Sequence, residues 1–148
     1  MLDRLIDLEP RSSSDPARSN LASIAELKQS VRRDLEWLLN TRHSPIEIGD
    51  DMEEVQNSMA VYGLPDMTGH GVEGYDEQDR LTASVENAIR IFEPRFLNLR
   101  VTMLPISSVD RELKFRIEAN LDVKPVPEAI SFDTVLQMGR GEFLVKNS

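Results

Sequence analysis

The chain has 148 residues, of which 17 are Lys or Arg and 26 are Asp or Glu, so its formal net charge is −9. It has no cysteine, which excludes disulfide scaffolds, thiolate zinc sites and cysteine nucleophiles. A chain this acidic is repelled by phosphate backbones, so we expect no nucleic-acid partner. Two histidines are too few for a metal site built on imidazole, and we expect no metal, cofactor or small-molecule substrate.

The first 18 residues differ in composition from the rest of the chain. Four apolar residues among the first eight would share one face of a two-turn helix, and residues 11–18, RSSSDPAR, have the composition of a linker. This helix is either a frayed end or an arm that docks on a partner or on the body of the chain. We expect a flexible N-terminal arm over residues 1–18 and a single domain over residues 19–148. Because no apolar run is long enough to span a membrane and no secretory signal is present, the expected location is cytoplasmic.

A long amphipathic helix is the clearest local prediction. From residue 21 to about residue 40, apolar residues recur at steps of three and four, which is the spacing of one helix face. These residues are Leu21, Ile24, Leu27, Val31, Leu35, Leu38 and Leu39. The stripe must pack against another part of the chain, because an isolated helix of this length is marginally stable. Trp37, the only tryptophan, is expected in the core or at its rim.

Two further helices are predicted before the chain changes character. The shorter one, capped by Asp50 or Asp51 and running to about Met59, would turn Met52 and Val55 inward. An extended glycine-rich connection follows it. Asp76 would cap the next helix. That helix should end at Glu93, because Pro94 disfavours helical backbone in the residue before it.

After the proline, the apolar period changes from that of a helix to two, which is typical of a strand with one buried face. The segments FLNLRVTMLPI and ELKFRIEANLDV alternate in this way, and the polar turn between them predicts an antiparallel hairpin. The residues expected to face the core are Leu97, Leu99, Val101, Met103, Leu113, Phe115, Ile117, Ala119 and Leu121. ISFDTVLQ and EFLVK indicate two shorter strands. The predicted class is α+β, with N-terminal helices packed on one face of a small, mainly antiparallel C-terminal sheet.

A pair of carboxylates is the catalytic chemistry that an acidic chain most easily supplies, as in glycoside hydrolysis. Glu93, at the switch from helix to strand, is the best placed, and a lysozyme-like peptidoglycan hydrolase using Glu93 is the alternative function. Arg95 argues against it, since a nearby cation favours the ionised carboxylate whereas a general acid must carry a proton. We therefore expect a binding protein and not an enzyme.

The tripeptide Glu93-Pro94-Arg95 has a second interpretation. Pro94 fixes the backbone, so both charged side chains can project toward the same side with little ordering cost. Arg95 could then bind a carboxylate or a helix C-terminus of a partner, with Glu93 orienting it. The other possibility is an internal salt bridge that ties the third helix to the sheet. The residues alone leave both open.

The predicted sheet offers another kind of interaction site. Its exposed edges can accept a strand of another chain by main-chain hydrogen bonding. The outward-facing residues Arg100, Lys114 and Arg116 form a locally basic row that could meet an acidic partner. Such a row can equally be a solvated face.

Five segments, taken together, resemble a known family. They are LDRL at 2–5, RDLEWLLNTR at 33–42, SMAVYGLPD at 58–66, FEPR at 92–95 and ISFDTVLQMGRGEFLV at 130–145. The chain is similar, over nearly its whole length, to the TssE baseplate subunits of type VI secretion systems. These belong to the wider family of contractile-phage baseplate wedge proteins labelled lysozyme-like.

This resemblance implies a non-enzymatic role in assembly. Members sit in a baseplate at the cytoplasmic side of the inner membrane, bind the wedge subunits TssF and TssG, and start polymerisation of the contractile sheath. Their Glu-Pro-Arg motif corresponds to Glu93, Pro94 and Arg95 and would bind the helical core bundle of the wedge. The expected partners are thus TssF, TssG and the sheath subunits, the last through an edge of the sheet.

Overall fold

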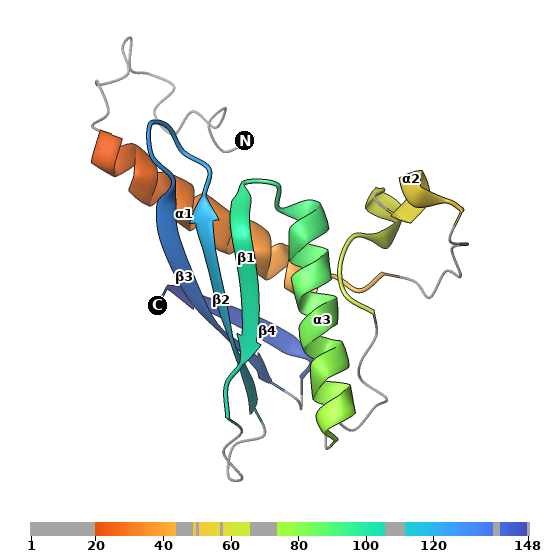
Figure 1. Ribbon diagram of the computed structural model, residues 1–148. Helices are drawn as coiled ribbons and strands as arrows, with labels where there is room; N and C mark the ends of the chain where they lie inside the picture. Colours follow the sequence, from red (N-terminus) through yellow and green to blue (C-terminus); the bar gives the residue numbers. More distant parts are fainter. Residues whose placement is uncertain are drawn as a thin grey trace, which may run out of the picture.

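The protein is an α+β fold in which helices cover one face of a four-stranded antiparallel sheet (Figure 1). A computed structural model describes residues 20–43, 49, 51–56, 58–65, 74–105, 112–137 and 140–147. The predicted N-terminal arm lies outside these residues. None of the helices in these ranges is long and apolar enough to cross a bilayer.

The four strands form a simple meander. They are β1 (Phe96–Met103), β2 (Glu112–Leu121), β3 (Glu128–Gln137) and β4 (Glu142–Asn147). Their spatial order is β1-β2-β3-β4 and every neighbouring pair is antiparallel, which confirms the predicted hairpin. The sequence indicated that the third strand is shorter than the second, but β3 is as long as β2. Its pairing with β2 begins at Glu128, before the apolar segment starts.

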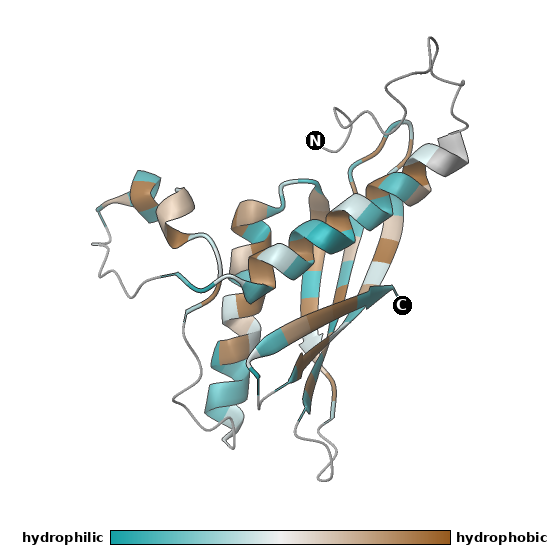
Figure 2. Ribbon diagram, turned by 180° about the vertical axis from the view of Figure 1, so that it is seen from behind, coloured by the Kyte–Doolittle hydropathy of each residue, from teal (hydrophilic) through white to brown (hydrophobic). Residues whose placement is uncertain are grey.

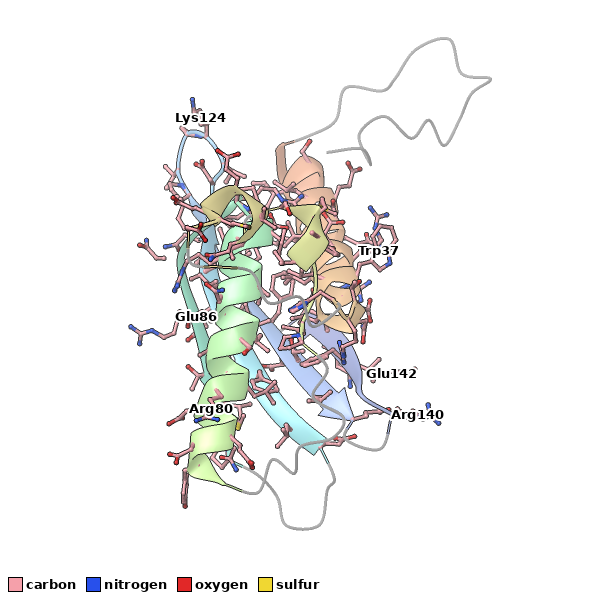
Figure 3. All side chains as sticks on the ribbon, turned by 90° about the vertical axis from the view of Figure 1, so that its right-hand side faces the viewer. Trp37, Arg80, Glu86, Lys124, Arg140 and Glu142 are labelled. Atoms are coloured by element: carbon pink, nitrogen blue, oxygen red, sulfur yellow. The ribbon has the colours of Figure 1, made fainter. Side chains whose placement is uncertain are left out.

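The α1 helix (Asn20–Asn40) carries the predicted stripe into the core. Val31, Leu35, Leu38 and Leu39 are all buried. Trp37 is not in the core, since 62% of it is exposed, and it projects from α1 away from the sheet (Figure 3). The sequence could not place Trp37, because its position borders the apolar stripe of α1. A residue at that border can belong to the buried face or to the exposed face of the helix.

The second predicted helix is wrong in length and in orientation. Only Glu53–Gln56 (α2) is helical there, followed by a single 3-10 turn, η2 (Met59–Val61). Met52 and Val55 are exposed, because four residues make too short a helix to bury an apolar face.

The α3 helix (Tyr75–Phe92) ends where it was predicted to end, and Glu93 is its C-cap. It begins two residues earlier than expected: Gly74 is the N-cap, and Asp76 lies in the first turn. An acidic residue is favourable in either place, because both lie at the positive end of the helix dipole.

The inner face of the sheet and the two long helices share one core. Every predicted inward residue of β2 is buried, and Figure 2 shows apolar and polar residues alternating along the strands. β1 departs from simple alternation, because a bulge between Leu97 and Arg100 shifts the register and leaves Leu97 39% exposed. Asn98 takes the left-handed backbone conformation at this bulge, with φ 53°.

Candidate functional site

The turn after α3 joins three parts of the fold. Pro94 follows the C-cap of α3, and Arg95 directly precedes β1. The backbone N–H of Asp122, just after β2, donates to the carbonyl of Arg95 at 2.8 Å. The turn is therefore attached to α3, to β1 and to the end of β2, which makes it a rigid platform for its side chains.

Arg95 lies between two carboxylates. Its Nε donates to Oε1 of Glu93 at 2.5 Å, its Nη2 donates to the other oxygen of Glu93, and Nη2 also donates to Oδ2 of Asp34 at 2.6 Å. The Glu93 side chain is only 4% exposed, whereas those of Arg95 and Asp34 are 25% and 30% exposed. The cluster thus has one carboxylate inside the protein and a face that reaches solvent.

These contacts hold the guanidinium in its charged form. The pKa of Arg95 is raised above its usual range, chiefly by its hydrogen bond to Glu93 and further by Asp34, while burial acts the other way. The pKa of Tyr62 is also raised, first by burial and then by the charges of Asp34 and Glu93. The cluster of Glu93, Asp34 and Arg95 therefore has two carboxylates and one fixed cation, and it lies beside Tyr62.

A cleft of about 390 Å³ opens beside this cluster. Its lining residues are Asp34, Leu35, Leu38, Tyr62, Phe92, Glu93, Pro94 and Arg95. Tyr62 packs edge-on against Phe92, with ring centroids 5.1 Å apart. An apolar floor with charges at one rim is the usual composition of a protein-binding site.

Gly63 makes this wall of the cleft possible. Its φ is 111°, and a Cβ there would lie 2.4 Å from the carbonyl oxygen of Thr41. The backbone at Gly63 therefore comes close to that of Thr41, and the N–H of Leu64 donates to the carbonyl of Thr41 at 2.9 Å. The side chain of Leu64 is buried in the core. Only glycine fits this backbone, and it is what brings Tyr62 against α3.

Of the two interpretations of Glu93-Pro94-Arg95, the structure shows the internal ion pairs. These pairs join the turn between α3 and the sheet to α1 as well, through Asp34. Asp34, 61 residues before Arg95, was not predicted. It follows two arginines on the polar side of α1, and nothing in that pattern pairs it with Arg95. The same cluster still presents Arg95 to solvent at the cleft, so the internal contacts leave a partner-binding role as a prediction.

The predicted basic row is mixed in charge. Arg100, Lys114 and Arg116 share the open face of the sheet, on the side away from the core, and do not meet the Glu93–Arg95 cluster. Arg100 lies opposite Glu118, and Arg116 donates to Asp133 at 2.9 Å. The hydrogen bond to Asp133 raises the pKa of Arg116. The row is therefore a face of cross-strand pairs, and its use by a partner stays a prediction.

The outer edge of β4 is occupied by side chains of α1 and of the residues that follow it. Asn40 accepts from the N–H of Phe143 at 2.8 Å and donates to its carbonyl at 2.9 Å. Arg42 donates to the carbonyl of Gly141 at 2.6 Å, and Arg32 to that of Val145 at 3.4 Å. We call Gly141–Val145 the closed β4 edge.

The outer edge of β1 is covered at one point. The N–H of Val101 donates to Oε2 of Glu86, a residue of α3, at 3.2 Å. Figure 3 shows Glu86 on the part of α3 that runs beside β1. Sequence reasoning found neither this contact nor those of Asn40 and Arg42, because a polar residue on a helix surface gives no sign of the strand it will reach.

Comparison with known proteins identifies a family. The sequence matches the model of the family described as baseplate wedge protein gp25 over residues 25–126, which includes most of α1, all of α3 and Glu93 to Arg95. No curated protein matches the sequence. Since the match covers more than half of its length, the chain belongs to the gp25 family of baseplate wedge proteins.

Proposed function

We propose that this chain is the TssE-type subunit of a type VI secretion baseplate at the cytoplasmic side of the inner membrane. It binds the wedge subunits TssF and TssG and starts polymerisation of the contractile sheath. The observation that carries the proposal is the family match, which spans the turn and the cleft beside it. The segments that resemble TssE lie on both sides of this cleft, at residues 33–42, 58–66 and 92–95.

The cleft supports wedge binding. Its apolar floor could receive a helix of the wedge, and Arg95 at the rim could meet the carbonyls at the C-terminus of that helix. Glu93 holds the guanidinium in place beforehand, so little side-chain entropy is lost on binding.

The sheet supports sheath initiation. An antiparallel sheet can accept an extended arm of a sheath subunit by strand addition at one of its edges. A template fixed on the baseplate removes part of the entropic cost of starting a polymer, and several copies in a ring would act together.

The same geometry favours assembly over catalysis. Both oxygens of Glu93 are hydrogen-bonded to Arg95, and Asp34 binds the same guanidinium. A glycosidase would need one of these carboxyl groups to carry and release a proton toward a substrate. Here both are committed to a cation.

Co-purification with TssF and TssG, using folded variants, tests the proposal. Arg95→Ala alone would leave Glu93 buried without its cation, and we expect a loss of about 3 kcal/mol of stability. The double variant Glu93→Gln, Arg95→Ala removes both charges and should recover much of that loss. It should still bind the wedge at least about tenfold more weakly, which corresponds to roughly 1.4 kcal/mol.

Arg90→Gln is the matched control, because it removes an ion pair with Glu86 outside the cleft and leaves Glu93–Arg95 in place. It should bind within about threefold of the original chain. Circular dichroism establishes that each variant is folded at the assay temperature. Full wedge binding by the folded double variant would show that the turn serves the fold alone, and no binding by the unaltered chain would refute the wedge role.

A further inference from the structure

The segment that contains α2 and η2 stands apart from the body of the protein. α2 and η2 pack on each other, and among the described residues neither forms an extended contact with α1, α3 or the sheet. Figures 1 and 2 show α2 set off from α3 and from the strands. No residue of either element is buried. We call residues 51–56 and 58–61 the projecting segment.

Local hydrogen bonds give the projecting segment a defined shape. The backbone N–H groups of Val55 and Gln56 donate to the carbonyl of Met52, at 3.0 and 3.1 Å. The Ser58 hydroxyl donates to the carbonyl of Val55 at 2.8 Å and accepts from the N–H of Ala60 at 3.2 Å. The segment is therefore held by its own backbone and by Ser58, without a core of its own.

The large apolar side chains of this segment are exposed. Met59 is 73% exposed and Met52 is 51% exposed, and Val55 is exposed as well. Single exposed apolar residues are common on protein surfaces, but here three lie within eight residues of a segment that has no core. Holding them there gains nothing from the hydrophobic effect until another surface covers them. They therefore indicate a surface that a partner covers.

The charges beside these residues define the chemistry of the partner. Asp51, Glu53 and Glu54 are all exposed, and no cation among the described residues pairs with them. Methionine side chains adapt to apolar grooves of irregular shape. A complementary surface thus has an apolar groove for the methionines and lysine or arginine residues at its rim.

A second copy of this chain does not fit that description. The apolar floor of its cleft is bordered by Glu93 and Asp34 as well as by Arg95, and the chain has a formal net charge of −9. An acidic segment is repelled by such a surface, so the partner is a different protein.

The projecting segment leads directly to the cleft. Tyr62 is the C-cap of η2 and also lines the cleft, where its ring packs against Phe92. The backbone N–H of Tyr62 donates to the carbonyl of Met59, three residues before it, at 3.2 Å. A partner that fills the cleft therefore needs to extend only about one helical turn further to cover Met59.

We propose that the projecting segment is a second contact with the wedge, and that its methionines enter an apolar groove of a wedge subunit rimmed by lysine or arginine. The inference rests on the proposed function and adds to it a surface outside the cleft. The cleft and the projecting segment then form one continuous interface, so the loss of either part lowers the affinity of the whole.

Wedge binding by polar variants of the projecting segment tests the proposal. Met52→Ser, Met59→Ser should bind the wedge at least about tenfold more weakly in titration calorimetry. The midpoint of urea unfolding should stay unchanged, because both side chains are exposed in the free protein. The matched control is Tyr75→Ser, Val126→Ser, which changes two exposed apolar residues outside the segment and should bind within about threefold.

Charge reversal provides the second arm. Glu54→Lys should weaken wedge binding at least about fivefold at low salt, and the difference should shrink at about 1 M salt, where charges are screened beyond roughly 3 Å. Glu142→Lys, also at an exposed position, makes the same change in net charge and should bind within about twofold. Equal weakening by both variants would show that net charge, and not the projecting segment, governs binding, and would overturn the inference.

The outcomes separate this inference from the proposed function. Full wedge binding by Met52→Ser, Met59→Ser, together with weakened binding by Glu93→Gln, Arg95→Ala, would overturn the inference and leave the proposed function standing. A dimer of the unaltered chain in sedimentation velocity that Met52→Ser, Met59→Ser abolishes would assign these residues to a second copy and overturn the inference as well. No wedge binding by the unaltered chain would refute the proposed function and the inference with it.

Discussion

Two consecutive stretches of one sheet border differ in what covers them. Along the closed β4 edge, side chains of Arg32, Asn40 and Arg42 bond the outward backbone groups. At the start of β3, Lys28 of the same helix instead bonds a side chain, that of Glu128, at 2.8 Å. The difference arises because α1 crosses the sheet at an angle and does not run along its border.

The comparison shows how a helix can close a strand edge without a further strand. The side-chain amide of Asn40 has the same donor and acceptor as a peptide group, and it engages Phe143 through both. Unpaired edges invite edge-to-edge association, which such contacts prevent. Asn40, Arg42 and Arg32 thus block the closed β4 edge.

Removing the amide at the closed β4 edge should have the largest effect of the substitutions that probe this comparison. Asn40→Ala leaves both backbone groups of Phe143 without their partners, so we expect a loss of about 1–2 kcal/mol in the free energy of unfolding. Self-association should appear as well, because the closed β4 edge would then be exposed. Urea denaturation and sedimentation velocity measure the two effects.

Thr41→Ala is the control for that variant, since its hydroxyl donates only to the carbonyl of Trp37 within the same helix end. It should cost less than about 0.5 kcal/mol and leave the protein monomeric. Equal behaviour of the two variants would mean that the edge is not closed by Asn40.

Arg42 offers a smaller test of the same edge. One of its nitrogens donates to the carbonyl of Leu39 at 2.7 Å, and the other to that of Gly141 at 2.6 Å. Arg42→Lys keeps the charge but cannot reach both carbonyls, so we expect a loss of about 1 kcal/mol by urea denaturation. The control Arg80→Lys, at an exposed position, should leave the free energy of unfolding almost unchanged. If Arg42→Lys leaves the free energy of unfolding unchanged, a positive charge alone is enough to stabilise this edge.

The smallest effect is expected at the edge of β1. Glu86→Gln keeps an oxygen for the N–H of Val101 and loses only an ion pair with the exposed Arg90, so it should change stability by less than about 0.5 kcal/mol. Glu86→Ala removes the acceptor and should cost about 1 kcal/mol, measured by urea denaturation. If both variants cost the same, the ion pair and not the edge contact would be what Glu86 contributes.

Parts of the fold that depend on periodicity could be predicted. The stripe of α1 and the alternation of β2 both lead directly to buried faces, because each pattern repeats over many residues and each apolar residue adds to the same preference. Met52 and Val55 were misplaced, since two apolar residues in a segment of four helical residues do not determine a face. The bulge at Asn98 was equally invisible, because the apolar spacing continues through it.

The candidate site, too, could be predicted only in part. That Glu93 and Arg95 come together around Pro94 follows from their closeness in the chain, and so the sequence alone could indicate a charged turn after α3. Asp34 and Gly63 complete that site from distant segments, and only the packing of α1 against α3 brings Asp34 within 2.6 Å of Arg95.

The sequence by itself determined which residues form helices and strands, which faces are buried and where the charged turn lies, because these depend on local spacing and on the hydrophobic effect. Only the tertiary structure decided which stretch of the sheet border is closed. Asn40 and Phe143 lie 103 residues apart, and their contact depends on the angle at which α1 crosses the sheet. Hydrogen-bonding groups at a strand edge are identical in every residue except proline, so their availability is a property of what packs beside them.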